Sequence, residues 1–130
     1  MRAGLTHRRA IIVGAGQSGL AVAAALAAEG LRPQHEFVVI DAASGRVTGR
    51  VETGSHPYGV AFAAGKGFVT DQYAATVTVF DPDSLETLGS IGIGDYPEGI
   101  AALSDGRRLA VASWDSNELS IIDGEKLVIE

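Results

Sequence analysis

The stretch DAASGRVTGRVETGSHPYGVAF (41–62) returns forty residues later as DPDSLETLGSIGIGDYPEGIAA (81–102). Seven of the 22 aligned positions are identical, namely Asp41/Asp81, Ser44/Ser84, Gly49/Gly89, Gly54/Gly94, Pro57/Pro97, Gly59/Gly99 and Ala61/Ala101. Beyond this stretch the repeat continues at an offset of 42, which aligns Val77 with Leu119. A period of this length indicates one supersecondary unit per repeat.

Each repeat carries a pattern of short strands separated by turn residues. The pattern predicts four strands in the complete repeat, over residues 58–62, 68–70, 76–80 and 85–93. Four antiparallel strands in about forty residues are typical of one β-propeller blade. By this count the chain holds the last two strands of one blade, a whole blade, and three strands plus the stub Lys126–Ile129 of another.

These blades form an incomplete propeller of about two blades, whereas closed propellers take about four to eight. We therefore expect exposed blade edges. Either copies of the chain associate through these edges, or the N-terminal segment covers them. The segments HPYGVAF, FVTDQYAATVTVFD, GDYPEGIA and SDGRRLAVASWDSNELSIID resemble the YVTN-type β-propeller repeat family over about residues 37–130. The leading functional hypothesis is a non-enzymatic module that binds or scaffolds an unidentified protein or small molecule.

A different pattern precedes the repeat. A short apolar run at 10–13 is followed by the glycine motif GAGQSG (14–19), and then by an Ala/Leu-rich stretch at 20–28 with high helix propensity. A second apolar run at 37–40 closes with Asp41. This order predicts a Rossmann-like βαβ unit with two parallel strands. The expected fold is therefore mixed, with a dinucleotide-binding unit at 1–41 and a propeller-type repeat segment at 42–130.

The glycine motif has the spacing that a dinucleotide requires. Gly14 allows the tight turn, Gly16 lets the backbone approach a pyrophosphate, and Gly19 permits close packing of helix and strand. Free N–H groups at the start of the helix would hold the phosphate charge. Asp41 follows Gly19 by 22 residues, about where a ribose-binding acid is expected.

The segment VGAGQSGLAV also resembles the N-terminal motif of FAD-dependent monooxygenases and related flavoproteins, over residues 9–41. The resemblance implies that Gly14, Gly16 and Gly19 hold the pyrophosphate of FAD and that Asp41 binds the adenosine ribose. An FAD-dependent oxidoreductase fragment is therefore the alternative function, and NAD(P) the alternative cofactor. A single βαβ unit lacks the further strands and the second domain with which flavoproteins enclose the isoalloxazine ring.

The N-terminus supports one more interpretation. Basic Arg2, Arg8 and Arg9 precede an apolar stretch and the small residues 25–27, as in a secretory signal. A retained N-terminus favours a cytoplasmic protein, and a cleaved one a periplasmic or secreted propeller. The run VVID (38–41) fits both the flavoprotein and the propeller pattern, so that an intact gene product, a fragment and a hybrid all remain open.

The composition narrows the classes of partner. The net charge is −6 and the sequence pI about 4.9, which argues against nucleic acid or an anionic membrane as the partner. The sequence contains no cysteine, and no apolar run reaches the roughly 18 residues of a membrane helix.

No catalytic or metal-binding constellation can be named from the sequence. His7, His35 and His56 stand in unrelated contexts and are expected to be solvated loop residues. A further group of polar residues is expected to consist of exposed turn residues, namely Asp71, Asp95, Asp115 and Asn117. Tyr73 and Trp114 fall next to one another in the repeat alignment, where they mark either a binding face or packing between blades.

Overall fold

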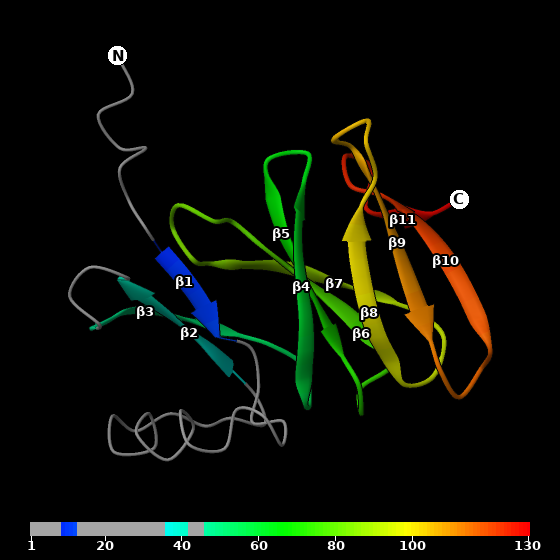
Figure 1. The fold of residues 1–130 in the computed structure, drawn as a ribbon, viewed down its shortest axis with the longest axis horizontal. Coiled ribbons are helices and arrows are strands. Elements are labelled where there is room, and N and C mark those ends of the chain that lie inside the picture. Colours follow the sequence, from blue (N-terminus) through cyan, green and yellow to red (C-terminus); the bar gives the residue numbers. More distant parts are fainter. Residues whose placement is uncertain (1–8, 13–35, 42–45) are drawn as a thin grey trace.

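Three antiparallel sheets make up the computed structural model, which describes residues 9–12, 36–41 and 46–130 (Figure 1). The first sheet contains β1 (Arg9–Ile12), β2 (Glu36–Asp41) and β3 (Val47–Glu52). The second contains β4 (Pro57–Ala63), β5 (Lys66–Asp71), β6 (Thr76–Phe80) and β7 (Thr87–Gly92). The third contains β8 (Pro97–Ala102), β9 (Arg108–Ser113), β10 (Glu118–Asp123) and β11 (Val128–Ile129). The described residues include no helix that could cross a membrane.

The second and third sheets are the two predicted blades. In each, four strands follow one another in sequence and pair with their neighbours, which confirms the expected four-stranded meanders. The backbone repeats in detail, because left-handed φ values recur at matching positions: His56/Tyr96, Ala75/Asn117 and Leu85/Leu127. A β-bulge also recurs in the first strand of both sheets, between Pro57 and Val60 and between Pro97 and Ile100.

The main core lies between the second and third sheets. Phe68, Val77 and Val79 of the second sheet have no exposed surface and pack with Leu109 and Ile122 of the third. Successive side chains of a strand point to opposite faces, so Val69 and Phe80 turn the other way and pack with Val51 of β3. The second sheet is therefore buried on both faces, as a blade inside a stack should be.

Strands β4 and β8 lie close together at Gly59. A Cβ atom at this residue would lie 2.8 Å from the carbonyl oxygen of Glu98. The hydroxyl of Thr70 bridges the two strands, accepting from the N–H of Gly59 (2.9 Å) and donating to the carbonyl of Glu98 (2.8 Å). The glycine is thus required for the contact between the blades.

Within the described part of the chain, the third sheet is covered on one face only. Leu109, Val111 and Ile122 are buried against the second sheet. By strand alternation Ala112 and Leu119 lie on the opposite face, where Ala112 is exposed and Leu119 is 71% exposed. We call this surface the open face; it is formed by Gly99, Ala101, Ala112, Leu119 and their neighbours. It is the counterpart of the face of the second sheet that packs against the third sheet.

The first sheet differs from the predicted βαβ unit. Strand β1 pairs antiparallel with β2, with Arg9 opposite Asp41 and Ile12 opposite Val38, so the expected parallel pairing is wrong. Because β2 also pairs antiparallel with β3, the three strands form a meander. In this meander β1 holds the position that β5 holds in the second sheet and β9 in the third. The helix predicted at 20–28 lies outside the described residues.

Candidate functional site

The predicted dinucleotide site falls largely outside the described residues. Gly14, Gly16 and Gly19 belong to that part, and Asp41 is the last residue of β2. In a Rossmann unit the glycine loop and the acid meet because both follow the carboxyl ends of adjacent parallel strands. Here Asp41 pairs with Arg9, at the start of β1, and Ile12 at the other end of that strand leads into the glycine motif. Because the glycine motif lies outside the described residues, the role predicted for Asp41 stays a prediction.

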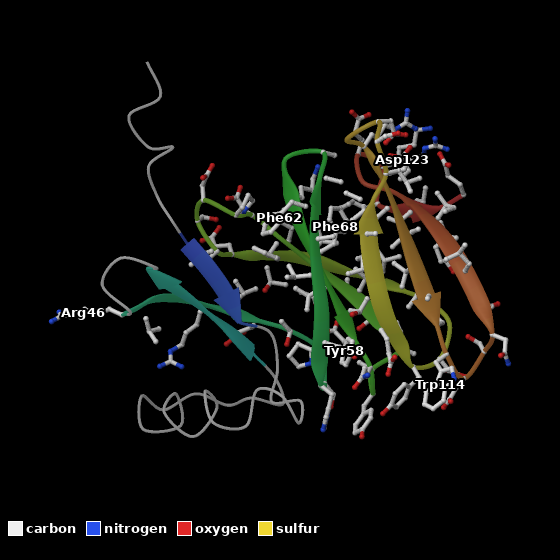
Figure 2. The ribbon with its side chains drawn as sticks, in the orientation of Figure 1. Arg46, Tyr58, Phe62, Phe68, Trp114 and Asp123 are labelled. Carbon is white, nitrogen blue, oxygen red and sulfur yellow. The ribbon has the colours of Figure 1, made fainter. Side chains whose placement is uncertain are left out.

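An unexpected arrangement of aromatic rings occupies one end of the second and third sheets. The ring centroids of His56 and Tyr73 are 3.8 Å apart, those of Tyr73 and Tyr96 5.6 Å, and those of Tyr96 and Trp114 6.0 Å. These four rings, which we call the aromatic row, come from four successive loops at the same end of the sheets. Figure 2 shows Trp114 at this end and Asp123 at the opposite one.

The repeat itself places these rings in one line. His56 and Tyr96 occupy the same left-handed position before a proline, with φ values of 56° and 57°. Their carbonyl groups accept equivalent hydrogen bonds, from the N–H of Gln72 and the N–H of Trp114, each at 3.0 Å. Each repeat supplies two rings, His56 with Tyr73 and Tyr96 with Trp114. Packing of the two blades brings Tyr73 next to Tyr96 and so joins the two pairs. Tyr73 and Trp114 remain 60% and 68% exposed, which favours the binding-face interpretation over packing between blades.

Asp71 departs from its expected place in an exposed turn, because its side chain is fully buried. Its Oδ2 atom accepts hydrogen bonds from the hydroxyls of Thr78 (2.7 Å) and Thr76 (2.9 Å). Gly54 closes over the carboxylate, since a Cβ there would lie 2.7 Å from Cγ of Asp71. Burial raises the pKa of Asp71 above its ordinary value, and the hydrogen bonds from Thr78, Thr76 and Gly54 oppose this only in part.

The raised pKa of Asp71 predicts that Asp71→Asn flattens the pH dependence of stability. The folded state holds the Asp71 proton more tightly than the unfolded state, so Asp71 costs stability as pH rises above 3.8. Asparagine keeps an oxygen for both threonines and does not ionise. Relative to the parent, the variant should gain stability between about pH 4 and pH 7 in urea unfolding. A difference that is constant with pH, or that favours the parent at pH 7, would contradict the assignment.

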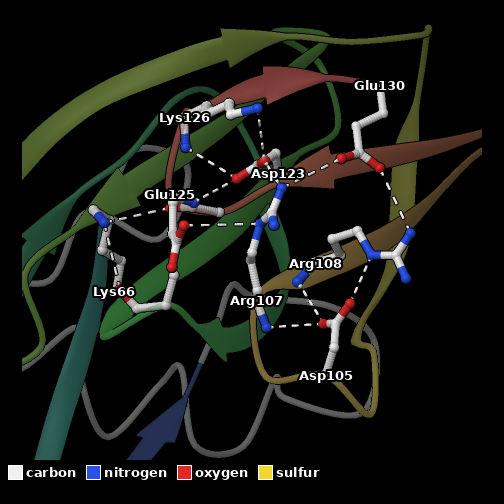
Figure 3. A network of polar contacts seen from close by, with 10 residues as sticks. Lys66, Asp105, Arg107, Arg108, Asp123, Glu125, Lys126 and Glu130 are labelled. Atoms are coloured by element: carbon white, nitrogen blue, oxygen red, sulfur yellow. Dashed lines mark hydrogen bonds and ion pairs between the residues drawn. The ribbon is translucent and has the colours of Figure 1, made fainter.

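The opposite end of the third sheet holds a network of charges (Figure 3). Arg107 donates to the buried carboxylate of Asp123, and Nε of Arg108 donates to Asp105 (2.6 Å). Oδ1 of Asp123 also accepts from the N–H groups of Glu125 and Lys126 at 2.9 and 3.0 Å. These contacts, with that from Arg107 largest, lower the pKa of Asp123, and equivalent hydrogen bonds lower that of Asp105 to about 2.

This charge network stabilises turns. Asp81, the counterpart of Asp123 in the preceding repeat, likewise accepts from the N–H groups of Asp83 and Ser84 at 2.8 and 2.9 Å. Both aspartates therefore close the hairpin that follows the third strand of a blade. In the described part of the chain no three His, Asp or Glu side chains are placed to hold a metal ion.

A hollow of about 420 Å³ adjoins the aromatic row on the open face of the third sheet. Its walls come from the first three strands of the sheet and the loop between β9 and β10, and are formed by Glu98, Gly99, Ala112, Ser113, Trp114, Asn117, Glu118 and Leu119. In the second sheet the corresponding surface is covered by β8, where Gln72 Nε2 donates to Glu98 Oε1 at 2.9 Å. The hollow thus corresponds to the surface that β8 covers on the second sheet.

The model of the NAD(P)-binding Rossmann-like domain matches residues 12–84, more than half of the chain. The chain belongs to this family. The match supports the predicted dinucleotide-binding motif and does not distinguish FAD from NAD(P). The matched residues also include strands β2 to β6, which are antiparallel in the structure.

Solved structures similar to this chain are propeller-like. Kuenenia stuttgartiensis hydrazine synthase is 26% identical with a TM-score of 0.70, over 76% of this chain and 29% of that chain. Dihydro-heme d1 dehydrogenase NirN in complex with DHE is 18% identical with a TM-score of 0.64, over 75% and 21%. U3-55K is 14% identical with a TM-score of 0.66, over 75% and 32%.

The described blades thus span about a third or less of these propeller-like chains. The likeness to NirN and U3-55K shows the fold alone. A comparison with the curated proteins found no match.

Proposed function

We propose that the chain is a propeller-type scaffold module of the YVTN repeat family, which stacks a further blade on the open face of its third sheet. The observation that carries the proposal is that this open face repeats a surface that is buried one blade earlier. Val77 of the second sheet has no exposed surface, and its counterpart Leu119 is 71% exposed.

The backbone of the open face leaves room for another first strand. A Cβ at Gly59 would meet the carbonyl oxygen of Glu98 at 2.8 Å, because β8 covers it. A Cβ at the equivalent Gly99 would meet only Cβ of Ala112, at 4.0 Å. The same bulge and the same glycine therefore present an unoccupied place on the third sheet.

The occupant that we propose is the first sheet of a second copy of this chain, whose strands β1 to β3 correspond to the second to fourth strands of a blade and would pack on the open face beside Gly99. Such a contact joins different surfaces of the two copies, and head-to-tail contacts of this kind close into rings when the rotation permits. Two copies of a three-sheet chain would bring together six sheets, within the roughly four to eight of closed propellers. Burial of apolar surface would drive the association.

Sedimentation velocity of the purified chain tests the stacking proposal. The parent should shift from a 13.4 kDa monomer to a dimer as its concentration rises, and Leu119→Asp should weaken this association at least tenfold. The reason is that the new carboxylate would be buried without a partner. Leu88→Asp is the matched control, since Leu88 is 50% exposed on the outer strand β7 and should leave the association unchanged. A parent that is monomeric at all concentrations would contradict the proposal.

A second candidate function is the binding of a dinucleotide, FAD in the first instance, by Gly14, Gly16 and Gly19. The family match at 12–84 favours it. Gly16→Val should abolish binding, because a side chain would hold the pyrophosphate away from the backbone. Asp41→Asn should weaken the binding, since Asp41 is the acid predicted to bind the ribose.

The visible absorbance spectrum after incubation with FAD and desalting measures this binding. A retained flavin spectrum that Gly16→Val removes would support the second candidate. A colourless parent, or a variant that retains FAD as the parent does, would exclude FAD as the ligand of this motif. A loss of FAD in Asp41→Asn would show that the acid does serve the ribose.

For localisation we propose a cytoplasmic protein that retains its N-terminus. Export is the alternative, with residues 1 to about 27 removed as a signal. Mass spectrometry of the mature N-terminus separates the two, because a start near Ala28 would show cleavage.

A further inference from the structure

The aromatic row lies in an acidic environment. Its four loops, 53–56, 72–75, 93–96 and 114–117, contain no lysine or arginine, and Asp95 and Asp115 in them are exposed. The basic residues of the second and third sheets lie at the opposite end, where Figure 3 shows all four, namely Lys66, Arg107, Arg108 and Lys126. Within the second and third sheets, the end that carries the rings thus holds carboxylates and no lysine or arginine.

Carboxylates stand directly beside the rings. Oε1 of Glu98 accepts from Gln72 at 2.9 Å, which holds this carboxylate next to the loop of Tyr73. A hydrogen bond that the Tyr96 hydroxyl donates to Tyr73 raises the pKa of Tyr96, and the charges of Glu98 and Asp115 raise it further. The hydroxyl of Tyr96 therefore lies within the field of both carboxylates. Exposed aromatic faces and negative charge occupy one surface.

This combination fits one chemical group better than others. A guanidinium group stacks on aromatic faces, where the ring quadrupole attracts its charge, and its planar fork binds carboxylates with two hydrogen bonds. A lysine ammonium also makes cation–π contacts and hydrogen bonds to carboxylates, but it has neither a planar face for stacking nor a fork for bidentate pairing. An anionic partner would be repelled, and a neutral sugar would leave the carboxylates without a counter-ion.

We infer that the aromatic row, together with Glu98 and Asp115, binds arginine side chains of a partner polypeptide. The site lies on loops at the end of the two blades and shares only Glu98 and Trp114 with the hollow on the face of the third sheet, where we propose stacking. The inference therefore goes beyond the scaffold proposal. Consecutive ring spacings of 3.8 to 6.0 Å place several rings within the reach of a few side chains of one peptide.

Fluorescence titration tests the inference directly, since Trp114 is the sole tryptophan and belongs to the row. An octaarginine peptide should change the Trp114 emission in a saturable manner, and an octalysine peptide should bind several-fold more weakly. A glycine–serine peptide of the same length should have no effect. Moderate salt should weaken the binding because exposed charges are screened.

Substitutions in the row define the site. Tyr96→Asn, which suits the left-handed backbone at that position, and Tyr73→Ala should each weaken octaarginine binding about two- to fivefold. Phe62→Leu is the matched control, because Phe62 is 47% exposed on β4 at the opposite end. Circular dichroism and the melting temperature check that each variant is folded.

The carboxylates are tested separately. Glu98→Gln with Asp115→Asn should weaken octaarginine binding about tenfold, whereas Asp83→Asn in the loop between β6 and β7 should not. Equal affinity of the parent and the row variants would overturn the inference, as would equal affinity for octaarginine and octalysine. A saturable response to a neutral hexasaccharide in place of the peptide would also overturn it.

Discussion

Phe68→Ala is expected to lower the free energy of unfolding by about 3 to 5 kcal/mol, because it removes a buried ring from a closely packed interior. Phe68 has no exposed surface and belongs to the cluster that joins the second and third sheets. Its neighbours are held by two sheets and cannot collapse freely into the cavity. Urea unfolding monitored by circular dichroism measures the loss.

Phe62→Ala provides the control for this substitution. The same atoms are removed six residues earlier, where the ring is 47% exposed. This ring lies edge-on to that of Phe80, with the two ring centroids 6.0 Å apart. We expect a loss of about 1 kcal/mol or less, since little burial is given up. Similar losses for the two variants would mean that the two blades do not share a core in solution.

Gly59→Val and Gly99→Val are expected to affect different properties, although the two glycines occupy the same position of the repeat. Gly59→Val should lower the stability of the monomer, whereas Gly99→Val should block stacking. At Gly59 the new side chain would meet the backbone oxygen of Glu98 at 2.8 Å and the hydroxyl of Thr70 at 3.2 Å. A backbone atom cannot move aside as a side chain can, so the blades must separate. We expect a loss of about 3 kcal/mol in the free energy of unfolding.

At Gly99 the same substitution should change the stability of the monomer by no more than about 0.5 kcal/mol, because the site is open. It should instead block the stacking of a further blade. Chemical denaturation measures the stability of the monomer, and sedimentation velocity measures the association that depends on stacking. Equal losses of stability at the two glycines would contradict the proposed difference between the covered and the open blade.

The blades could be predicted from the sequence because the information for them is local. Turn residues and alternating apolar residues recur every 40 to 42 positions, as between Val77 and Leu119. The burial of Asp71 could not be predicted in this way. It depends on Gly54 and Thr78, which approach Asp71 only when β3, β5 and β6 assemble.

Two further features show what a local pattern leaves undetermined. An apolar run such as that of β1 predicts a strand and carries no information about the direction of its partner. The aromatic row depends on packing between blades, so neither Tyr96 nor the line of rings was recognised from the sequence. One signal was present, because His56 and Tyr96 align at an offset of 40 and each precedes a proline.

The most direct test of the stacking proposal is the rate of thiol labelling at single introduced cysteines, since the chain has none of its own. Val77→Cys should react slowly with a maleimide at every protein concentration, because β8 and its neighbours bury this position. Leu119→Cys should react rapidly in dilute solution and progressively more slowly as the concentration rises, and Gly99→Val in the same chain should restore rapid labelling. Rapid labelling of Leu119→Cys that does not change with concentration would show that nothing covers the open face and would contradict the account.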